Sequence, residues 1–81
     1  MDKTDFQSLR IGQTIYHQFR KNADGSRLRA RVNGKVKEWK RTGAWLIPMK
    51  HGLRDCFYIG PQVSSVSRDF ADPANWSLDD N

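Results

Sequence analysis

The chain has 81 residues, nine of them aromatic, and carries a formal net charge of +5. This length suits a single domain over residues 1–81 and is too short for two. The one cysteine, Cys56, excludes a disulfide within the chain and is typical of a reducing compartment, so we expect a cytoplasmic protein. No apolar run reaches the length of a membrane span or signal sequence, which predicts no membrane partner.

The charge is unevenly distributed along the chain. From Arg10 to Arg54 twelve basic residues face two acidic ones, a formal charge of +10, whereas residues 69–81 hold four acids and no base. The sequence therefore predicts a cationic body, with a barrel core at about 11–68. Its acidic tail, 69–81, either folds back on that body or remains in solvent.

The first element predicted is a short helical turn near the start of the chain. Thr4 and Gln7 match the capping-box pattern, in which two side chains cap the first backbone amides of a helix. We expect a turn over residues 5–9 that presses Phe6 and Leu9 against the core.

Residues 13–19 alternate and are rich in residues that favour strands, so they predict the first strand. Ile15, His17 and Phe19 share one face of it. Residues 21–26 form a loop by composition, in which Asp-Gly supplies the positive φ of a hairpin turn.

The segment 27–41, RLRARVNGKVKEWKR, holds seven of the fourteen Lys and Arg residues and also alternates. Its apolar set lies at even positions: Leu28, Ala30, Val32, Gly34 and Val36. Its other set lies at odd positions: Arg27, Arg29, Arg31, Asn33, Lys35, Lys37 and Trp39. A period of two predicts an extended strand that is apolar on one face and cationic on the other.

Asn33-Gly34 allows two conformations of this segment. A two-residue hairpin turn would pair Val32 with Lys35 and mix core and solvent residues on one face. A continuous strand bent at Gly34 keeps the apolar residues together, and it is the favoured interpretation.

The next predicted strands are 44–49, short and apolar enough to be buried on both faces, 56–59, and a last short strand within 62–67. Pro48 has no amide to donate, so we place it at the end of its strand or on an edge. Residues 50–53 form a turn.

Asp72 and Pro73 form a helix-start pattern, after which Trp76 and Leu78 anchor the tail and the last residues fray. Short strands joined by tight turns predict an all-β fold. We expect a small SH3-like barrel or roll of about five strands, with short helical turns at the termini.

Two stretches carry a resemblance. GQTIYH at 12–17 followed by VNGKVK at 32–37 is similar to the opening of small SH3-like barrels in nucleic-acid-binding and adaptor proteins. VNGKVKEWKR, with IPMKHGL and FYI, resembles small uncharacterised proteins of bacteria, phages and mobile elements. The first implies a barrel fold, and the second implies no activity. The glycine pattern of ribosomal-type barrels is absent.

Cations interleaved with an aromatic residue predict nucleic-acid binding, because cations neutralise phosphates while an aromatic ring stacks on a base. The candidate residues are Arg29, Arg31, Lys35, Lys37, Trp39, Lys40 and Arg41. Two alternatives remain: a solvated outer strand with Trp39 turned into the core, or a module that binds another protein or copies of itself.

Other chemistry has little support in the sequence. His17, His51 and Cys56 lack the spacing of a metal site or a catalytic set, and Cys56 begins an apolar strand, where a buried thiol is inert. Lys50-His51-Gly52 is either a polar turn or a cradle for an anion. We therefore expect a non-catalytic protein with no catalytic residues, metal or cofactor.

Overall fold

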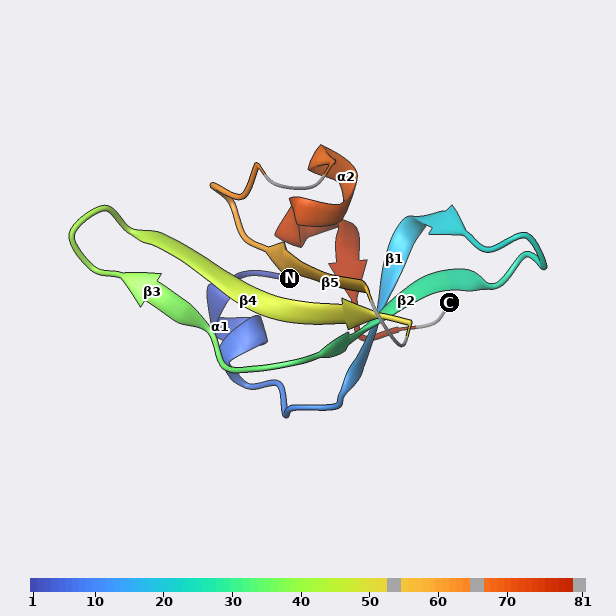
Figure 1. The fold of residues 1–81 in the computed structure, drawn as a ribbon, viewed down its shortest axis with the longest axis horizontal. Coiled ribbons are helices and arrows are strands. Elements are labelled where there is room, and N and C mark those ends of the chain that lie inside the picture. Colours follow the sequence, from blue (N-terminus) through green and yellow to red (C-terminus); the bar gives the residue numbers. More distant parts are fainter. Residues whose placement is uncertain (53–54, 65–66, 80–81) are drawn as a thin grey trace.

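The computed structural model describes residues 1–52, 55–64 and 67–79. Its elements in chain order are α1 (Lys3–Gln7), β1 (Thr14–Lys21), β2 (Arg27–Val32), β3 (Lys37–Trp39), β4 (Ala44–His51), β5 (Asp55–Ile59), α2 (Arg68–Ala71), the 3-10 turn η1 (Pro73–Asn75) and β6 (Trp76–Ser77). The prediction of a mainly β fold with short helical turns near both ends is confirmed (Figure 1).

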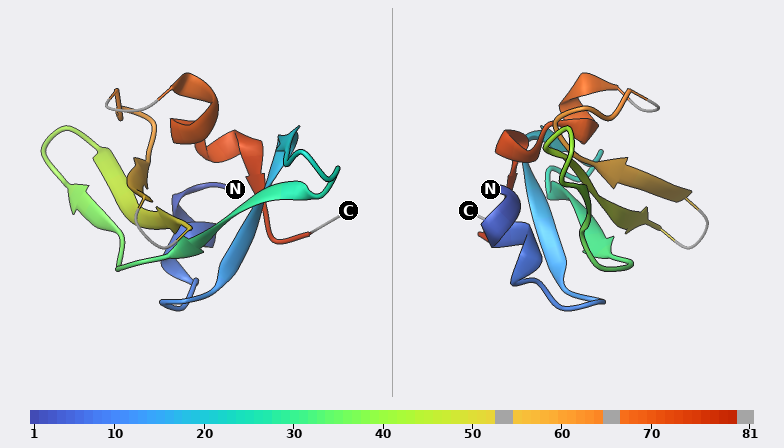
Figure 2. Two further views of the ribbon diagram at one scale, coloured as in Figure 1. Left: turned by 45° about the vertical axis from the view of Figure 1, so that its right-hand side comes forward. Right: turned by 90° about the vertical axis from the view of Figure 1, so that its left-hand side faces the viewer.

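All strand pairings are antiparallel, in the order β3-β4-β2-β1-β6, with β5 paired to β4. Met49 of β4 pairs with Val32 on one side and Phe57 on the other, so β5 lies on the opposite edge of β4 from β2 and β3. Among the described residues no pairing joins β5 to β6. The strands therefore form one open, curved sheet, as the two views of Figure 2 show.

The core lies under the inner face of this sheet. Leu28, Ala30 and Val32 of β2 are buried, whereas Arg29 and Arg31 between them are exposed, as the alternation predicts. The rest of the core comes from α1, β1, β4, β5 and the C-terminal segment: Phe6, Ile15, Trp45, Ile47, Met49, Phe57, Ile59, Ala71 and Trp76.

β2 and β3 are two halves of one bent strand along β4. Val32 pairs with Met49 and Lys37 pairs with Leu46, so four residues, 33–36, lie opposite two residues of β4. A bulge of two extra residues bends the strand but preserves its alternation, because the side-chain period is two. The bend at Gly34 is confirmed, but the strand is not continuous, because residues 33–36 are outside β2 and β3 and Gly34 and Val36 are half-buried. The hairpin at Asn33-Gly34 is wrong.

Pro48 lies inside β4, a central strand, and not at a strand end or edge as predicted. It lies opposite the bulge, where its carbonyl accepts a hydrogen bond from the Asn33 amide at 2.9 Å. Because a bulge interrupts the ladder of hydrogen bonds, no ladder hydrogen bond at this position requires an amide from Pro48.

The N-terminal helix begins earlier than predicted. Its capping box is made by Asp2 and Asp5, not by Thr4 and Gln7. The Asp2 carboxylate accepts from the Asp5 amide at 2.9 Å, and Asp5 accepts from the Asp2 amide at 3.0 Å. An ionised carboxylate near a helix N-terminus also gains from the helix dipole, which the Thr-Gln pair does not.

β1 departs from its predicted alternation after His17. Ile15 and His17 are buried, but Phe19 is 72% exposed. The amides of Phe19 and Arg20 both donate to Nδ1 of His17, at 3.1 and 3.0 Å, and the pairing with β2 shifts between Tyr16 and Lys21. This irregularity turns Phe19 outward.

Two further expectations for the strands need correction. Residues 44–49 are fully buried on one face only, because Ala44, Leu46 and Pro48 stay half-buried. Residues 62–64 form no strand, and residues 65–66 of the strand predicted within 62–67 lie outside the described residues.

The C-terminal segment ends in β6 on the free edge of β1. Asp72 caps η1 through its side chain at 3.0 Å from the Ala74 amide, as predicted. Trp76 is buried and anchors the segment, but Leu78 is half-exposed and does not. No helix in the described ranges is long and apolar enough to cross a membrane.

Candidate nucleic-acid interface

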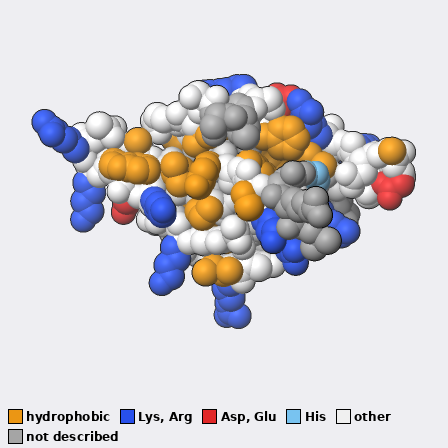
Figure 3. Space-filling view, viewed as in Figure 1, with side chains coloured by type: hydrophobic (Ala, Val, Ile, Leu, Met, Phe, Trp, Pro, Cys, Tyr) orange, Lys and Arg blue, Asp and Glu red, His pale blue; other side chains and the backbone are white. Residues whose placement is uncertain are grey.

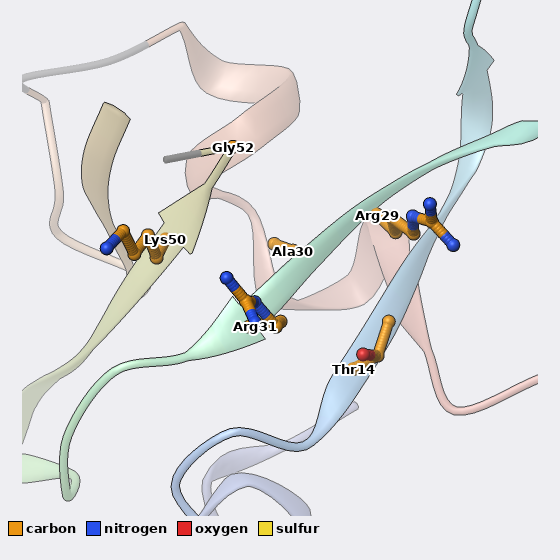
Figure 4. A pocket seen from close by; sticks show the side chains of 6 residues that line it. All are labelled: Thr14, Arg29, Ala30, Arg31, Lys50 and Gly52. Atoms are coloured by element: carbon orange, nitrogen blue, oxygen red, sulfur yellow. The ribbon is translucent and has the colours of Figure 1, made fainter. Parts of the chain in front are cut away.

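The outer face of the sheet carries a groove of about 350 Å³, which we call the cationic groove. It is lined by Thr14, Arg29, Ala30, Arg31, Lys50 and Gly52 (Figure 4). In β-sheet register Arg31 pairs with Thr14 on one side and Lys50 on the other. Directly paired residues project from the same face, so three strands bring these side chains together. Figure 4 shows Arg31 and Lys50 extending to the same side, with Arg29 further along β2.

Arg31 and Lys50 are like charges in direct cross-strand register. Such a pair is destabilising unless an anion lies near it. Among the described residues two ion pairs form, Lys3 with Glu38 and Arg20 with Asp69, each at 3.0 Å. Neither involves a cation of the groove. The groove therefore concentrates positive charge with no carboxylate paired to it in the described part of the chain.

The acidic tail folds back on the body through buried Ala71 and Trp76 and through the pairing of β6 with β1, and one of its carboxylates forms an ion pair there. Asp69 of α2 binds Arg20, whose guanidinium also lies 4.8 Å from the centre of the Phe70 ring. Arg27 is similarly occupied by the backbone, because its guanidinium donates to the Gln18 carbonyl at 3.1 Å. These cations stabilise the fold, and they lie outside the predicted set.

The seven predicted residues fall into three places. Arg29 and Arg31 line the cationic groove, and Lys35 lies in the bulge beside α1, in a separate pocket with Gln7. The remaining four belong to β3 and the turn that joins it to β4: Lys37, Trp39, Lys40 and Arg41. All four are exposed, and Trp39 is exposed to 50%. The alternative that turned Trp39 into the core is wrong.

Trp39 borders a second groove of about 340 Å³, which we call the aromatic groove. Its lining is mostly apolar: Trp39, Ala44, Trp45, Leu46, Tyr58, Gln62, Val63 and Ser64. Tyr58, 44% exposed, reaches it from β5. Figure 3 shows hydrophobic side chains gathered over the β3–β4 end of this face, with Lys and Arg side chains at its margin.

Sequence reasoning did not place Lys50 or Tyr58 in the nucleic-acid site. Lys50 appeared in a predicted turn, 50–53, with Lys50-His51-Gly52 as a possible cradle for an anion, whereas β4 continues to His51. Both residues join the outer face through strand register: Lys50 pairs with Arg31, and Tyr58 pairs with Pro48. Pairing across strands is a tertiary property. The signal present in the sequence was that Leu46, Pro48 and Lys50 occupy the even positions of one strand.

The residues considered for metal binding or catalysis, Cys56, His51 and His17, differ in their surroundings. Cys56 is exposed, contrary to prediction, because it pairs with Lys50 on the outer face. His51 pairs one position further along, with Asp55, and its Nδ1 lies 3.1 Å from the Arg29 carbonyl. His17 is fully buried, with both ring nitrogens engaged. In the described ranges no three His, Cys, Asp or Glu residues gather in a way that could hold a metal ion.

Comparison with protein families, curated proteins and solved structures finds no match for this chain.

Proposed function

We propose that this protein is a non-catalytic module that binds nucleic acid across the outer face of its sheet. The cationic groove holds backbone phosphates through Arg29, Arg31 and Lys50. The observation that carries the proposal is the Arg31–Lys50 pair, two cations in direct register with no carboxylate paired to them among the described residues.

A bound phosphate compensates the repulsion between Arg31 and Lys50. Like charges in direct cross-strand register destabilise a sheet, and a bound phosphate converts their repulsion into attraction. The Thr14 hydroxyl, on the third strand of the groove, is a further donor for a phosphate oxygen. This arrangement favours a polyanion over a neutral partner.

The cations of the β3–β4 turn extend the surface. Lys37, Lys40 and Arg41 surround Trp39, which pairs with Ala44, six positions along β4 from Lys50. At about 3.3 Å a residue, the two regions lie about 20 Å apart on one face of the sheet. A single strand of several nucleotides can span that separation, and site sizes of about 4–16 nucleotides are typical of small β-domains.

A charge-matched pair of variants tests the proposal. Arg31→Gln with Lys50→Gln removes two positive charges from the groove, whereas Lys21→Glu changes the net charge equally at the exposed far end of β1. We expect the double variant to bind a fluorescent 15-nucleotide oligonucleotide at least tenfold more weakly at about 0.1 M salt, with Lys21→Glu close to the parent. An equal loss of affinity in both variants would show that overall charge alone causes the effect, and it would contradict phosphate binding in the cationic groove.

Self-association is the second candidate. Trp39, Tyr58, Phe19 and Ile11 are exposed hydrophobic side chains, and β3 has one unpaired edge in the described structure. Exposed apolar side chains and open strand edges are features of interfaces between copies. Light scattering coupled to size-exclusion chromatography distinguishes the two: a dimer whose mass is insensitive to salt, with no bound nucleic acid, favours self-association.

A further inference from the structure

The aromatic groove contains features that a phosphate site does not need. It is lined by an exposed Trp39 and an exposed Tyr58, with Leu46 and Val63 beside them. Its volume of about 340 Å³ lies within the range of small-ligand sites. An apolar hollow of this kind buries a flat, uncharged group and not a phosphate.

Two polar side chains border the same hollow, Gln62 and Ser64. A glutamine amide offers both a donor and an acceptor, and a serine hydroxyl offers either. Apolar walls with a few polar groups suit a ligand that stacks through its faces and forms hydrogen bonds through its edge. A nucleobase has this chemistry.

The charges around the groove identify what such a base is attached to. Three cations near Trp39 are exposed. They are Lys37, two residues before it, and Lys40 and Arg41 in the adjoining turn. Among the residues that the structure describes, no acidic side chain lines the groove. Glu38, between Lys37 and Trp39, pairs with buried Trp45 on the inner face and forms an ion pair with Lys3. A cationic margin of this kind complements a phosphate backbone and disfavours an acidic or purely apolar partner.

We propose that the aromatic groove takes an unpaired nucleobase, stacked on Trp39 and Tyr58, so that the ligand is single-stranded nucleic acid. This rests on the proposed function, and it adds a ligand class that the cationic groove alone does not define. A base within a duplex is stacked on its neighbours, and its faces are not accessible to the ring of Trp39.

The test uses three probes of equal length and one protein concentration series. The probes are a 15-nucleotide oligothymidylate, the same backbone with abasic sites in place of bases, and a 15-base-pair duplex. Binding is followed by fluorescence anisotropy. We expect the oligothymidylate to bind at least fivefold more tightly than the abasic strand, and more tightly than the duplex at equal phosphate concentration.

The variants are Trp39→Ala, Trp39→Phe and, as a matched control, Phe19→Ala. Phe19 is an exposed aromatic residue of β1 outside the groove. Loss of one stacking contact corresponds to about a 5- to 150-fold weaker affinity. We expect this loss for Trp39→Ala with oligothymidylate, partial recovery for Trp39→Phe, and no change for Phe19→Ala. The abasic strand should not distinguish Trp39→Ala from the parent.

The outcomes separate this inference from the proposed function. Equal binding of the abasic and thymidylate strands, with affinity still lost in the Arg31→Gln, Lys50→Gln variant, overturns the base site and keeps the phosphate groove. A dimer that becomes a monomer in Trp39→Ala, without a change in oligothymidylate affinity, assigns the aromatic groove to a second copy and overturns the inference. Absence of binding to every probe overturns both.

Discussion

Gly34 lies directly against Pro48, so that a Cβ at Gly34 would be 2.6 Å from Cγ of the proline ring. This contact lies in the bulge of the bent strand, beside β4, and it requires a residue without a side chain. We expect Gly34→Ala to destabilise the protein by about 1–3 kcal/mol through overpacking.

A double-mutant cycle in urea tests the cause. Pro48→Ala removes Cγ, so the cost of Gly34→Ala should be smaller in the Pro48→Ala background than in the parent. Strictly additive costs, or a Gly34→Ala variant as stable as the parent, would show that the two residues do not limit the bend.

His17 fastens the C-terminal segment to β1, and its loss should be costly. Its Nδ1 accepts from the amides of Phe19 and Arg20, and its Nε2 donates to the Asp69 carbonyl at 2.9 Å. His17→Leu takes the Nδ1 acceptor from the Phe19 and Arg20 amides and removes one of two donors to the Asp69 carbonyl, which Asn75 still contacts at 3.3 Å. Each buried group left without a partner costs about 1–3 kcal/mol. We expect a loss of about 3 kcal/mol or more by chemical denaturation. His51→Leu, which removes one contact at a partly exposed position, should lose less than about 1 kcal/mol, and equal losses would contradict this role.

The cationic groove should cost stability in the absence of a ligand. Since Arg31 and Lys50 repel each other across the β2–β4 ladder, Arg31→Gln with Lys50→Gln should leave the melting temperature unchanged or raise it by a few degrees. Thermal unfolding followed by circular dichroism, in low salt and without nucleic acid, measures this. A marked fall in the melting temperature would indicate that the two side chains serve the fold and not a ligand.

Asp24 shapes the loop between β1 and β2, and its titration reports that conformation. Hydrogen bonds from the Ser26 hydroxyl at 2.6 Å and the Ser26 amide at 3.0 Å lower the pKa of Asp24, and the charge of Arg29 adds to the effect. A lowered folded-state pKa stabilises the fold above the unfolded value, about 3.9 for Asp, and this contribution is lost as the pH falls through the folded value. A carboxyl titration by NMR should show the midpoint below that value, and Ser26→Ala should raise it. A midpoint unchanged by Ser26→Ala would contradict the loop geometry.

The alternating segment shows how far sequence reasoning extends. Its period of two correctly assigned Leu28, Ala30 and Val32 to the core, and the exclusion of a mixed face correctly favoured the bent strand over the hairpin. The alternation of faces continues across the bulge because the bulge adds two residues, one full period of a strand. Trp39 therefore remains on the outer face with Arg31.

The errors arose where a side-chain hydrogen bond or a paired strand, and not the local alternation, decides the conformation. The Phe19 and Arg20 amides turn to His17, which exposes Phe19. Pro48 is tolerated in a central strand because the bulge lies opposite it. Lys50 joins the candidate site only through its register with Arg31. Local patterns give the face of a residue within its strand, whereas strand pairing determines which faces meet.

The most direct test of the account is the salt dependence of oligonucleotide affinity in the parent, the Arg31→Gln, Lys50→Gln variant and Lys21→Glu. Each phosphate neutralised on a single strand contributes about −0.7 to the slope of log affinity against log salt concentration. Removing two groove cations should therefore make the slope shallower by about 1.4, whereas Lys21→Glu should keep the parent slope. Identical slopes in all three proteins would contradict phosphate binding by Arg31 and Lys50.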